Sequence, residues 1–237
     1  MCNVLRQLKL RYTLTTKITV SPLSESFAED LRLFAGTCRT VAGMKQFHIG
    51  AIGARTTAFK TVRFDEIAMA NHRITVETID LADVFARMDR MGGKQLEEKK
   101  AVYAALSDFD TYPPEKLENI ARLGAVIDDL IAEYDLHAIA IRCWNELQLR
   151  YGIAPCLILC ELNERGIAAC ELDVTNAVMM GALYLAADHL VMLLDVNNNY
   201  GDSDNACIFF HCGPAPPVYD GGTGTHRGAS DVPQILW

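Results

Sequence analysis

The second half of the sequence contains two carboxylates and an imidazole that each end an apolar run. Glu171 follows GIAAC, Asp195 ends LVMLLD, and His211 follows ACIFF. A carboxylate in such a position needs a partner, because an unpaired charge is costly to bury. Two carboxylates and an imidazole suit a hard divalent cation such as Mn²⁺ or Mg²⁺ better than structural zinc. Glu171, Asp195 and His211 are therefore candidate metal ligands, with a hydrogen-bonded core histidine as the alternative for His211.

Polar residues near these positions have both structural and functional interpretations. Asp173 precedes a helical pattern that starts at residue 174, so we expect it to cap that helix. The triplet Asn197-Asn198-Asn199 predicts a turn, but amide side chains also donate to and accept from hydroxyl groups. Arg55, in GAIGAR, could meet an anion, although a lone Gly-x-x-Gly more often marks a tight turn.

The elements that must position these side chains alternate between strand and helix. Six apolar runs are predicted strands, and they begin near residues 47, 73, 137, 166, 190 and 206. Helical patterns separate most of them, over 26–41, 59–67, 80–88, 114–134, 156–164 and 174–187. Such alternation predicts an α/β fold with a doubly wound, mainly parallel sheet. Because ligands bind at the carboxyl ends of parallel strands, we expect Glu171, Asp195 and His211 to cluster at one edge.

The chain divides into three parts by composition. Residues 1–22 give no clear element, and the capping-box pattern Ser26 to Glu29 then starts the α/β core, which extends over 23–212. Residues 213–237 are rich in glycine and proline with almost no periodicity, which predicts a loop or a disordered tail.

Bulk properties exclude several classes of function. The formal net charge of −8 argues against a nucleic-acid surface, which needs a clustered basic face. The longest apolar stretch is interrupted by Asp188 and His189, so it predicts a buried helix followed by a strand and no membrane span. The first residues form a poor signal peptide, and we expect a cytoplasmic protein.

The eight cysteines have no secretory context that would favour disulfides. Cys143, Cys156, Cys160 and Cys170 lie among isoleucine, alanine and leucine, where a reduced cysteine behaves as a small hydrophobic residue. A zinc site usually needs four ligands with tighter cysteine pairs. We therefore expect these cysteines in the core.

Several segments, taken in order, resemble the fucose and arabinose isomerase superfamily, above all its L-fucose isomerase-like branch. They span roughly residues 25 to 215 and are GAIGARTTAFKTVRFDE, AIRCWNELQLRYGIAPC, LNERGIAACELDV, DVNNNYGD and FFHCG. The resemblance implies a sugar isomerase in which two carboxylates hold a divalent metal, usually Mn²⁺. The same carboxylates serve in proton transfer between C1 and C2 of a small-molecule sugar.

Carried over to this chain, the resemblance makes Glu171 and Asp195 the catalytic carboxylates. Asp195 lies 24 residues after Glu171, which is similar to the fucose isomerase spacing. His211 falls where the arabinose branch places a histidine ligand. Trp144, Glu146 and Asn198 are expected to contact the sugar, since a ring face, a carboxylate and an amide are common partners of hydroxylated ligands.

The chain also departs from the family pattern. Leu172 stands where glycine is usual, and regions expected before and after the matched segments are missing. We therefore expect a fold truncated at both ends, an internal portion of a longer isomerase that is homo-oligomeric when intact. The alternatives are a non-catalytic sugar-binding or interaction module, and an inactive fragment.

Overall fold

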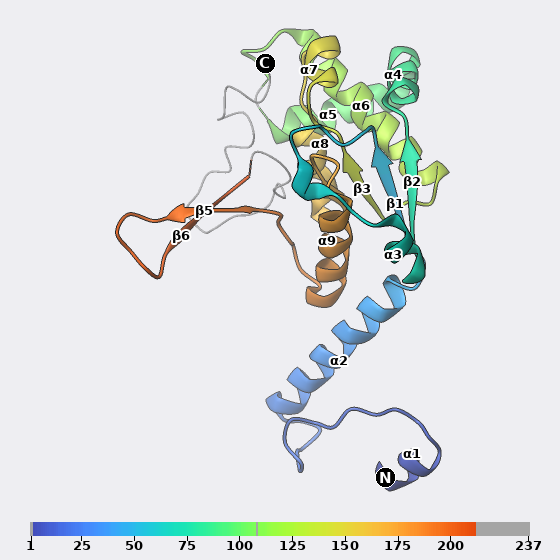
Figure 1. The fold of residues 1–237 in the computed structure, drawn as a ribbon, viewed down its shortest axis with the longest axis vertical. Helices are drawn as coiled ribbons and strands as arrows, with labels where there is room; N and C mark the ends of the chain where they lie inside the picture. Colours follow the sequence, from blue (N-terminus) through green and yellow to red (C-terminus); the bar gives the residue numbers. More distant parts are fainter. Residues whose placement is uncertain (1, 108, 212–237) are drawn as a thin grey trace.

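The computed structural model describes residues 2–107 and 109–211, and a four-stranded sheet lies at its centre (Figure 1). The strand order is β2-β1-β3-β4, and every neighbouring pair is parallel. The bounds are Phe47–Ile52 for β1, Ile74–Ile79 for β2, Ala138–Ile141 for β3 and Ala168–Ala169 for β4. The predicted doubly wound α/β fold is confirmed.

The strand order places a switch in winding direction between β1 and β3. From β1 the chain goes to β2 on one side, and then returns to β3 and β4 on the other. Ile52 is in register with both Ile79 and Ile141, so the first three strands end level with one another. In open α/β sheets, the crevice at such a switch point is where ligands bind.

Helices cover both faces of the sheet (Figure 1). One face packs against α4 (Leu81–Arg90), α5 (Gly93–Leu106), α6 (Pro114–Glu133) and α8 (Cys156–Leu162). The other face packs against α3 (Glu66–Asn71) and α9 (Val174–Ala187). The remaining helical elements are α1 (Cys2–Gln7), α2 (Glu25–Gly43), η1 (Lys60–Val62), α7 (Glu146–Tyr151) and η2 (Asn163–Arg165).

The side chains of β3 explain why both faces can be covered. Ile139 and Ile141 belong to the larger core cluster, and Ala138 and Ala140 belong to the cluster on the face of α9. All four residues are fully buried. Strands that are buried on both sides form continuous apolar runs, and this one was predicted for that reason.

Helix α2 begins two residues earlier than predicted. Its N-cap is Ser24, whose hydroxyl accepts a hydrogen bond from the backbone N–H of Phe27. Ser26 instead lies inside the first turn. The residue that caps is the one whose backbone is still extended, as Ser24 is, and a pattern of residue types alone does not reveal this.

The apolar side chains of α2 do not pack on the core in the described part of the chain. Leu31, Phe34 and Val41 are each at least half exposed, and α2 extends away from the sheet (Figure 1). The helix meets the body at the end of α9, where Arg39 Nε donates to the carbonyl of Leu185 at 3.1 Å.

The strand predicted over 190–196 is wrong for most of its length, and the strand predicted over 206–212 forms as β6 but does not join the parallel sheet. Residues 190–194 have no regular secondary structure, and β5 (Asp195–Asn199) pairs antiparallel with β6 (Cys207–Phe210) in a separate exposed hairpin. Only residues 200–206 connect the two strands. Parallel neighbours need a crossover of about a dozen residues or more, so this connection is too short for the arrangement that we expected.

No helix among the described residues has the length and apolar character needed to cross a membrane. The predicted tail over 213–237 lies outside the described residues, and the segment over 1–22 contains the short helix α1.

Candidate functional site

Two segments meet at the switch point between β1 and β3. The loop after β1 and the segment after β3 are joined by Arg142, whose Nη1 donates to the carbonyl of Ala54 at 3.5 Å. The rings of Phe59 and Trp144 pack edge to face, with centroids 5.1 Å apart. The carboxyl edge of the sheet is therefore built from both sides of the switch point.

Two of the predicted sugar contacts, Trp144 and Glu146, lie in this region. They differ in exposure and in hydrogen bonding. Trp144 is 44% exposed, so its side chain is accessible to a ligand. Glu146 is engaged already, because its Oε2 lies 2.9 Å from Arg142 Nε and also accepts from the backbone N–H of Asn145 at 3.0 Å. Trp144 is thus free to contact a ligand, and Glu146 holds Arg142 in place.

The loop after β1 supplies a cation and a hydroxyl. Arg55 Nη1 donates to the carbonyls of Thr56 and Phe59, both at 3.1 Å, and no ion pair of Arg55 occurs among residues 2–107 and 109–211. The buried Thr56 Oγ1 has no hydrogen-bond partner in the same part of the chain. Buried hydroxyls are rarely left unpaired, so this position fits a polar ligand atom.

Glu171 follows β4 in a strained turn. Glu171 and Leu172 have φ angles of +61° and +58°, the left-handed region that favours glycine. The turn is fixed on both sides: Leu172 N–H donates to the carbonyl of Ile141 at 3.1 Å, and Asp173 caps α9 by accepting from Asn176 N–H at 3.0 Å. The predicted capping role of Asp173 is confirmed. Strain that the surroundings enforce is typical of functional sites.

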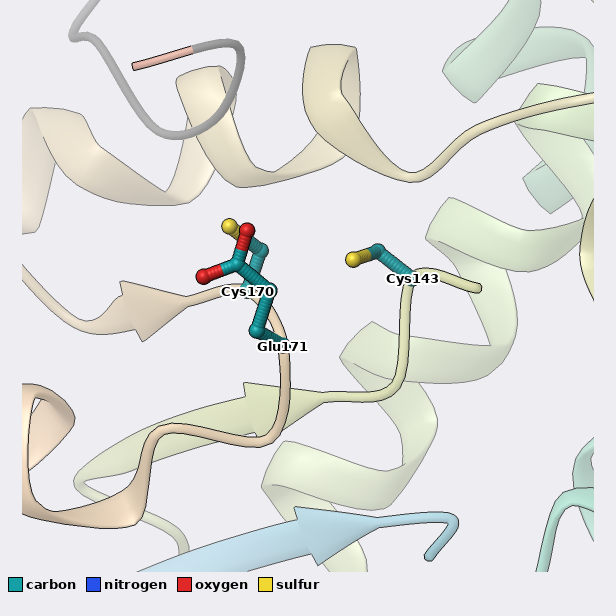
Figure 2. A group of neighbouring side chains, drawn as sticks. All are labelled: Cys143, Cys170 and Glu171. Carbon is teal, nitrogen blue, oxygen red and sulfur yellow. The ribbon is translucent and has the colours of Figure 1, made fainter. Parts of the chain in front are cut away.

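The Glu171 carboxylate lies beside two thiols (Figure 2). One ligand atom each from Cys143, Cys170 and Glu171 lies within 4.8 Å of the others, and Cys143 points toward the other two side chains. His211 completes the group: its Nε2 lies 2.9 Å from Cys170 Sγ and 3.7 Å from Glu171 Oε1. We call Cys143, Cys170, Glu171 and His211 the thiol cluster.

Burial and hydrogen bonding set the protonation of this cluster. A hydrogen bond with Cys143 and burial raise the pKa of the Cys170 thiol, and the negative charge of Glu171 raises it further. His211 Nδ1 lies 3.2 Å from the carbonyl of Leu193, and a carbonyl only accepts. Nδ1 therefore carries a ring proton, and Nε2 faces Cys170 Sγ.

Of the three predicted ligands, the structure brings together Glu171 and His211. Asp195 is the first residue of β5, is exposed, and lies opposite Phe210 in the hairpin. Among the described residues, the group of close metal-ligating atoms does not include Asp195. Asn198 is also exposed on β5. Ligation by Asp195 and sugar contact by Asn198 stay predictions.

Sequence reasoning missed the proximity of the two thiols, although a signal for it was present. Cys143 and Cys170 each follow a strand, two residues after β3 and one residue after β4, and these strands are parallel neighbours. Their positions at strand ends indicated a site as strongly as the position of Glu171 did.

A cavity among the described residues lies elsewhere. It is an open groove of about 790 Å³ between α2 and the end of α9, with Arg32, Arg39 and Asp188 in its lining. It contains neither a buried unpaired polar group nor the thiol cluster. The positions of the chemically reactive side chains therefore identify the carboxyl edge of the sheet, and not this groove, as the candidate site.

The chain is similar to three curated sugar isomerases. It is 30% identical over 181 residues to the sulfoquinovose isomerase of Alkalicoccus urumqiensis, covering 73% of this chain and 40% of that protein. It is 23% identical over 202 residues to the sulfoquinovose isomerases of Priestia aryabhattai and Priestia megaterium, covering 81% of this chain and 44% of each of them. This chain thus spans less than half the length of these relatives.

The names of these relatives support the coarser part of the sequence resemblance, a sugar isomerase, and none of them names L-fucose. No protein-family model matches the chain.

Proposed function

We propose that this chain forms the α/β part of an aldose–ketose isomerase, in which Glu171 moves a proton between C1 and C2 of a sugar. The observation that carries the proposal is the position of Glu171: a strained turn at the carboxyl edge of a doubly wound sheet, in a chain similar to sulfoquinovose isomerases. Fold alone would not identify a function, because doubly wound sheets serve many chemistries.

The surroundings of Glu171 support a role in proton transfer. Its side chain keeps 18% of its surface exposed, so it can reach a ligand, and the His211 imidazole lies 3.7 Å away. A positioned carboxylate takes the proton from the carbon next to the carbonyl and returns it to the neighbouring carbon. The enediolate formed between the two transfers needs nearby hydrogen-bond donors and exclusion of water.

The proposed substrate is a sugar that carries an anionic group, because the relatives are named for a sulfo-sugar. Arg55 is the side chain that we assign to the anion, since a guanidinium binds such oxygens in a fixed geometry and Arg55 forms no ion pair within the described residues. Thr56 Oγ1 and the partly exposed Trp144 are proposed to contact the sugar itself.

A divalent cation, Mn²⁺ or Mg²⁺, remains part of the proposal because the sequence resemblance implies it. The donors gathered around Glu171 do not fit such an ion, since two of the four are thiols and hard cations prefer oxygen ligands. More than half the length of the relatives lies outside the matched part, where further oxygen ligands would have to lie. The proton transfer described here accordingly uses the residues of this chain alone.

The proposal is tested by hydrogen exchange at the sugar carbon. The full chain is incubated in D₂O with sulfoquinovose or L-fucose, with and without Mn²⁺, and deuterium at C2 is followed by NMR. This measurement detects proton abstraction even where release of the ketose is slow. We expect exchange with the wild-type chain and none with Glu171→Gln, which keeps the shape of the side chain and removes the proton acceptor.

Glu164→Gln is the matched control, because Glu164 is an exposed carboxylate on η2. It should exchange at the wild-type rate. Equal exchange by the wild type and Glu171→Gln would remove Glu171 from the chemistry. Sugar binding without exchange by the wild type would contradict the isomerase and favour a non-catalytic sugar-binding module.

A further inference from the structure

We propose that the thiol cluster, Cys143, Cys170, His211 and Glu171, binds a thiophilic divalent cation such as Zn²⁺. This site differs in donor set from the oxygen-rich site that the sequence predicts, although it shares Glu171 and His211 with that site, and its metal binding is measured without the isomerase activity. It consists of two thiols, one imidazole and one carboxylate, a combination that occurs in tetrahedral zinc sites.

The spacing of the donors fits one tetrahedral ion. Bonds of about 2.3 Å to sulfur and about 2.0–2.2 Å to nitrogen and oxygen place neighbouring donors ~3.3–3.8 Å apart. In the structure, Cys143 Sγ, Cys170 Sγ and a Glu171 oxygen lie within 4.8 Å of one another, and His211 Nε2 is 2.9 Å and 3.7 Å from two of these groups. His211 is not within 4.8 Å of all three of the other donors, so Cys143 and His211 would have to move toward each other to complete the coordination.

The imidazole is already oriented as a ligand. The His211 side chain is only 4% exposed, and its Nδ1–H donates to the carbonyl of Leu193 at 3.2 Å. Histidines that bind metals almost always donate their other ring N–H to a carbonyl or carboxylate, which fixes the tautomer and the ring plane. Nε2, the nitrogen that would bind the metal, consequently points into the cluster, toward Cys170 Sγ.

The two thiols are held by the rigid part of the fold. Cys143 and Cys170 are both buried and follow the adjacent strands β3 and β4. The Cys143 carbonyl accepts from Gln148 Nε2 at 2.6 Å, and Leu172 N–H bonds to the end of β3 at 3.1 Å. The donors thus need little ordering when an ion enters, and each thiol releases its proton to solvent as its bond to the metal forms.

The soft sulfur donors of the thiol cluster distinguish it from a site for Mn²⁺. Thiolates select zinc and other soft or borderline ions, whereas Mn²⁺ and Mg²⁺ favour carboxylate, carbonyl and water ligands. With one carboxylate among four donors, the cluster should bind Zn²⁺ or Co²⁺ and should not be saturated by Mn²⁺ at similar concentrations. The binding of Co²⁺ is directly visible, because cobalt thiolates absorb in the near ultraviolet.

The test uses the full reduced chain, with Zn²⁺ titrated by calorimetry and Co²⁺ by absorption. We expect one bound ion per chain, a thiolate-to-cobalt band, and displacement of cobalt by Zn²⁺ but not by Mn²⁺. Cys143→Ser and Cys170→Ser should each lose the thiolate-to-cobalt band. Losing an outer-shell partner of a ligand weakens metal binding by about 10–100-fold, and each of these variants should weaken the binding of Zn²⁺ by more than that. Circular dichroism verifies that each variant is folded.

Cys160→Ser is the matched control, because Cys160 is a partly buried cysteine of α8 outside the cluster. It should bind as the wild type does. A second measurement needs no mutation: Zn²⁺ should slow alkylation of Cys143 and Cys170, located by mass spectrometry, and leave exposed Cys38 unaffected. Unchanged binding in both serine variants, equal competition by Mn²⁺, or alkylation unaffected by Zn²⁺ would overturn the proposal.

Discussion

Leu172 gives a direct test of the strained turn beside Glu171. The side chain is buried, with 6% exposure, and its backbone has a φ of +58°, which a leucine adopts at a cost. Replacement by alanine or by glycine removes nearly the same packing. Only glycine also relieves the backbone, so the difference between Leu172→Ala and Leu172→Gly reports the strain.

The magnitudes follow from the two contributions. Truncating a buried leucine to alanine lowers the free energy of unfolding by about 2–5 kcal/mol. Glycine then avoids a left-handed penalty of about 1–2 kcal/mol. Its larger freedom in the unfolded chain costs about 0.5–1 kcal/mol. Leu172→Gly should therefore be as stable as Leu172→Ala, or up to about 1.5 kcal/mol more stable, by these same estimates.

Leu162 provides the matched position, because it is also buried and has an ordinary φ of −64°. There the glycine variant should be less stable than the alanine variant by about 1 kcal/mol. Urea unfolding of all four variants, followed by circular dichroism, measures the two differences. The turn is not strained if Leu172→Gly is less stable than Leu172→Ala by the same margin that separates the glycine and alanine variants at Leu162.

Two further predictions concern the contact between α5 and α6. Gly124→Ala should lower the free energy of unfolding by about 1–3 kcal/mol in urea denaturation, because the new methyl group would lie 2.1 Å from Tyr103 Oη. Gly92→Ala meets nothing within 4 Å, and equal stability of the two variants would contradict this close packing. Burial and the Glu161 carboxylate raise the pKa of Tyr103 above its ordinary value of about 10. The folded state therefore keeps the proton that the unfolded chain loses, so stability should fall as the pH rises above about 10, by up to roughly 1.4 kcal/mol per pH unit. Tyr103→Phe should lack this loss, and unfolding curves with the same pH dependence in both proteins would show that Tyr103 does not cause it.

The parallel sheet could be predicted from sequence because its strands carry strong local signals. The run at Ala138–Ile141 is apolar on both faces, and Asp80 and Asp173 cap the helices that follow β2 and the Glu171 turn. Helix α5 lacked such a signal. Its buried residues Leu96 and Lys99 are part of the charged run KQLEEKK, where the inward face is marked by very few apolar side chains.

The candidate site was only partly predictable for a different reason. Glu171 and its neighbours are fixed by strand ends, which local patterns reveal. The position of Asp195 depends on the pairing partner of β5, and an apolar run does not specify a partner. The thiols were assigned to the core from their neighbours in sequence. They are indeed buried, but burial on adjacent strand ends also brings them together, and only the strand order reveals that.

The thiol cluster is assembled from three distant points of the chain, which affects how it can form during folding. Cys170 lies 27 residues after Cys143, and His211 lies 41 residues after Cys170. Bringing Cys143 and Cys170 together costs about 3 kcal/mol of chain entropy, which contacts between β3 and β4 must offset. The cluster therefore cannot form as a local event, and it appears only once β3 and β4 have paired and residues 193–211 have docked.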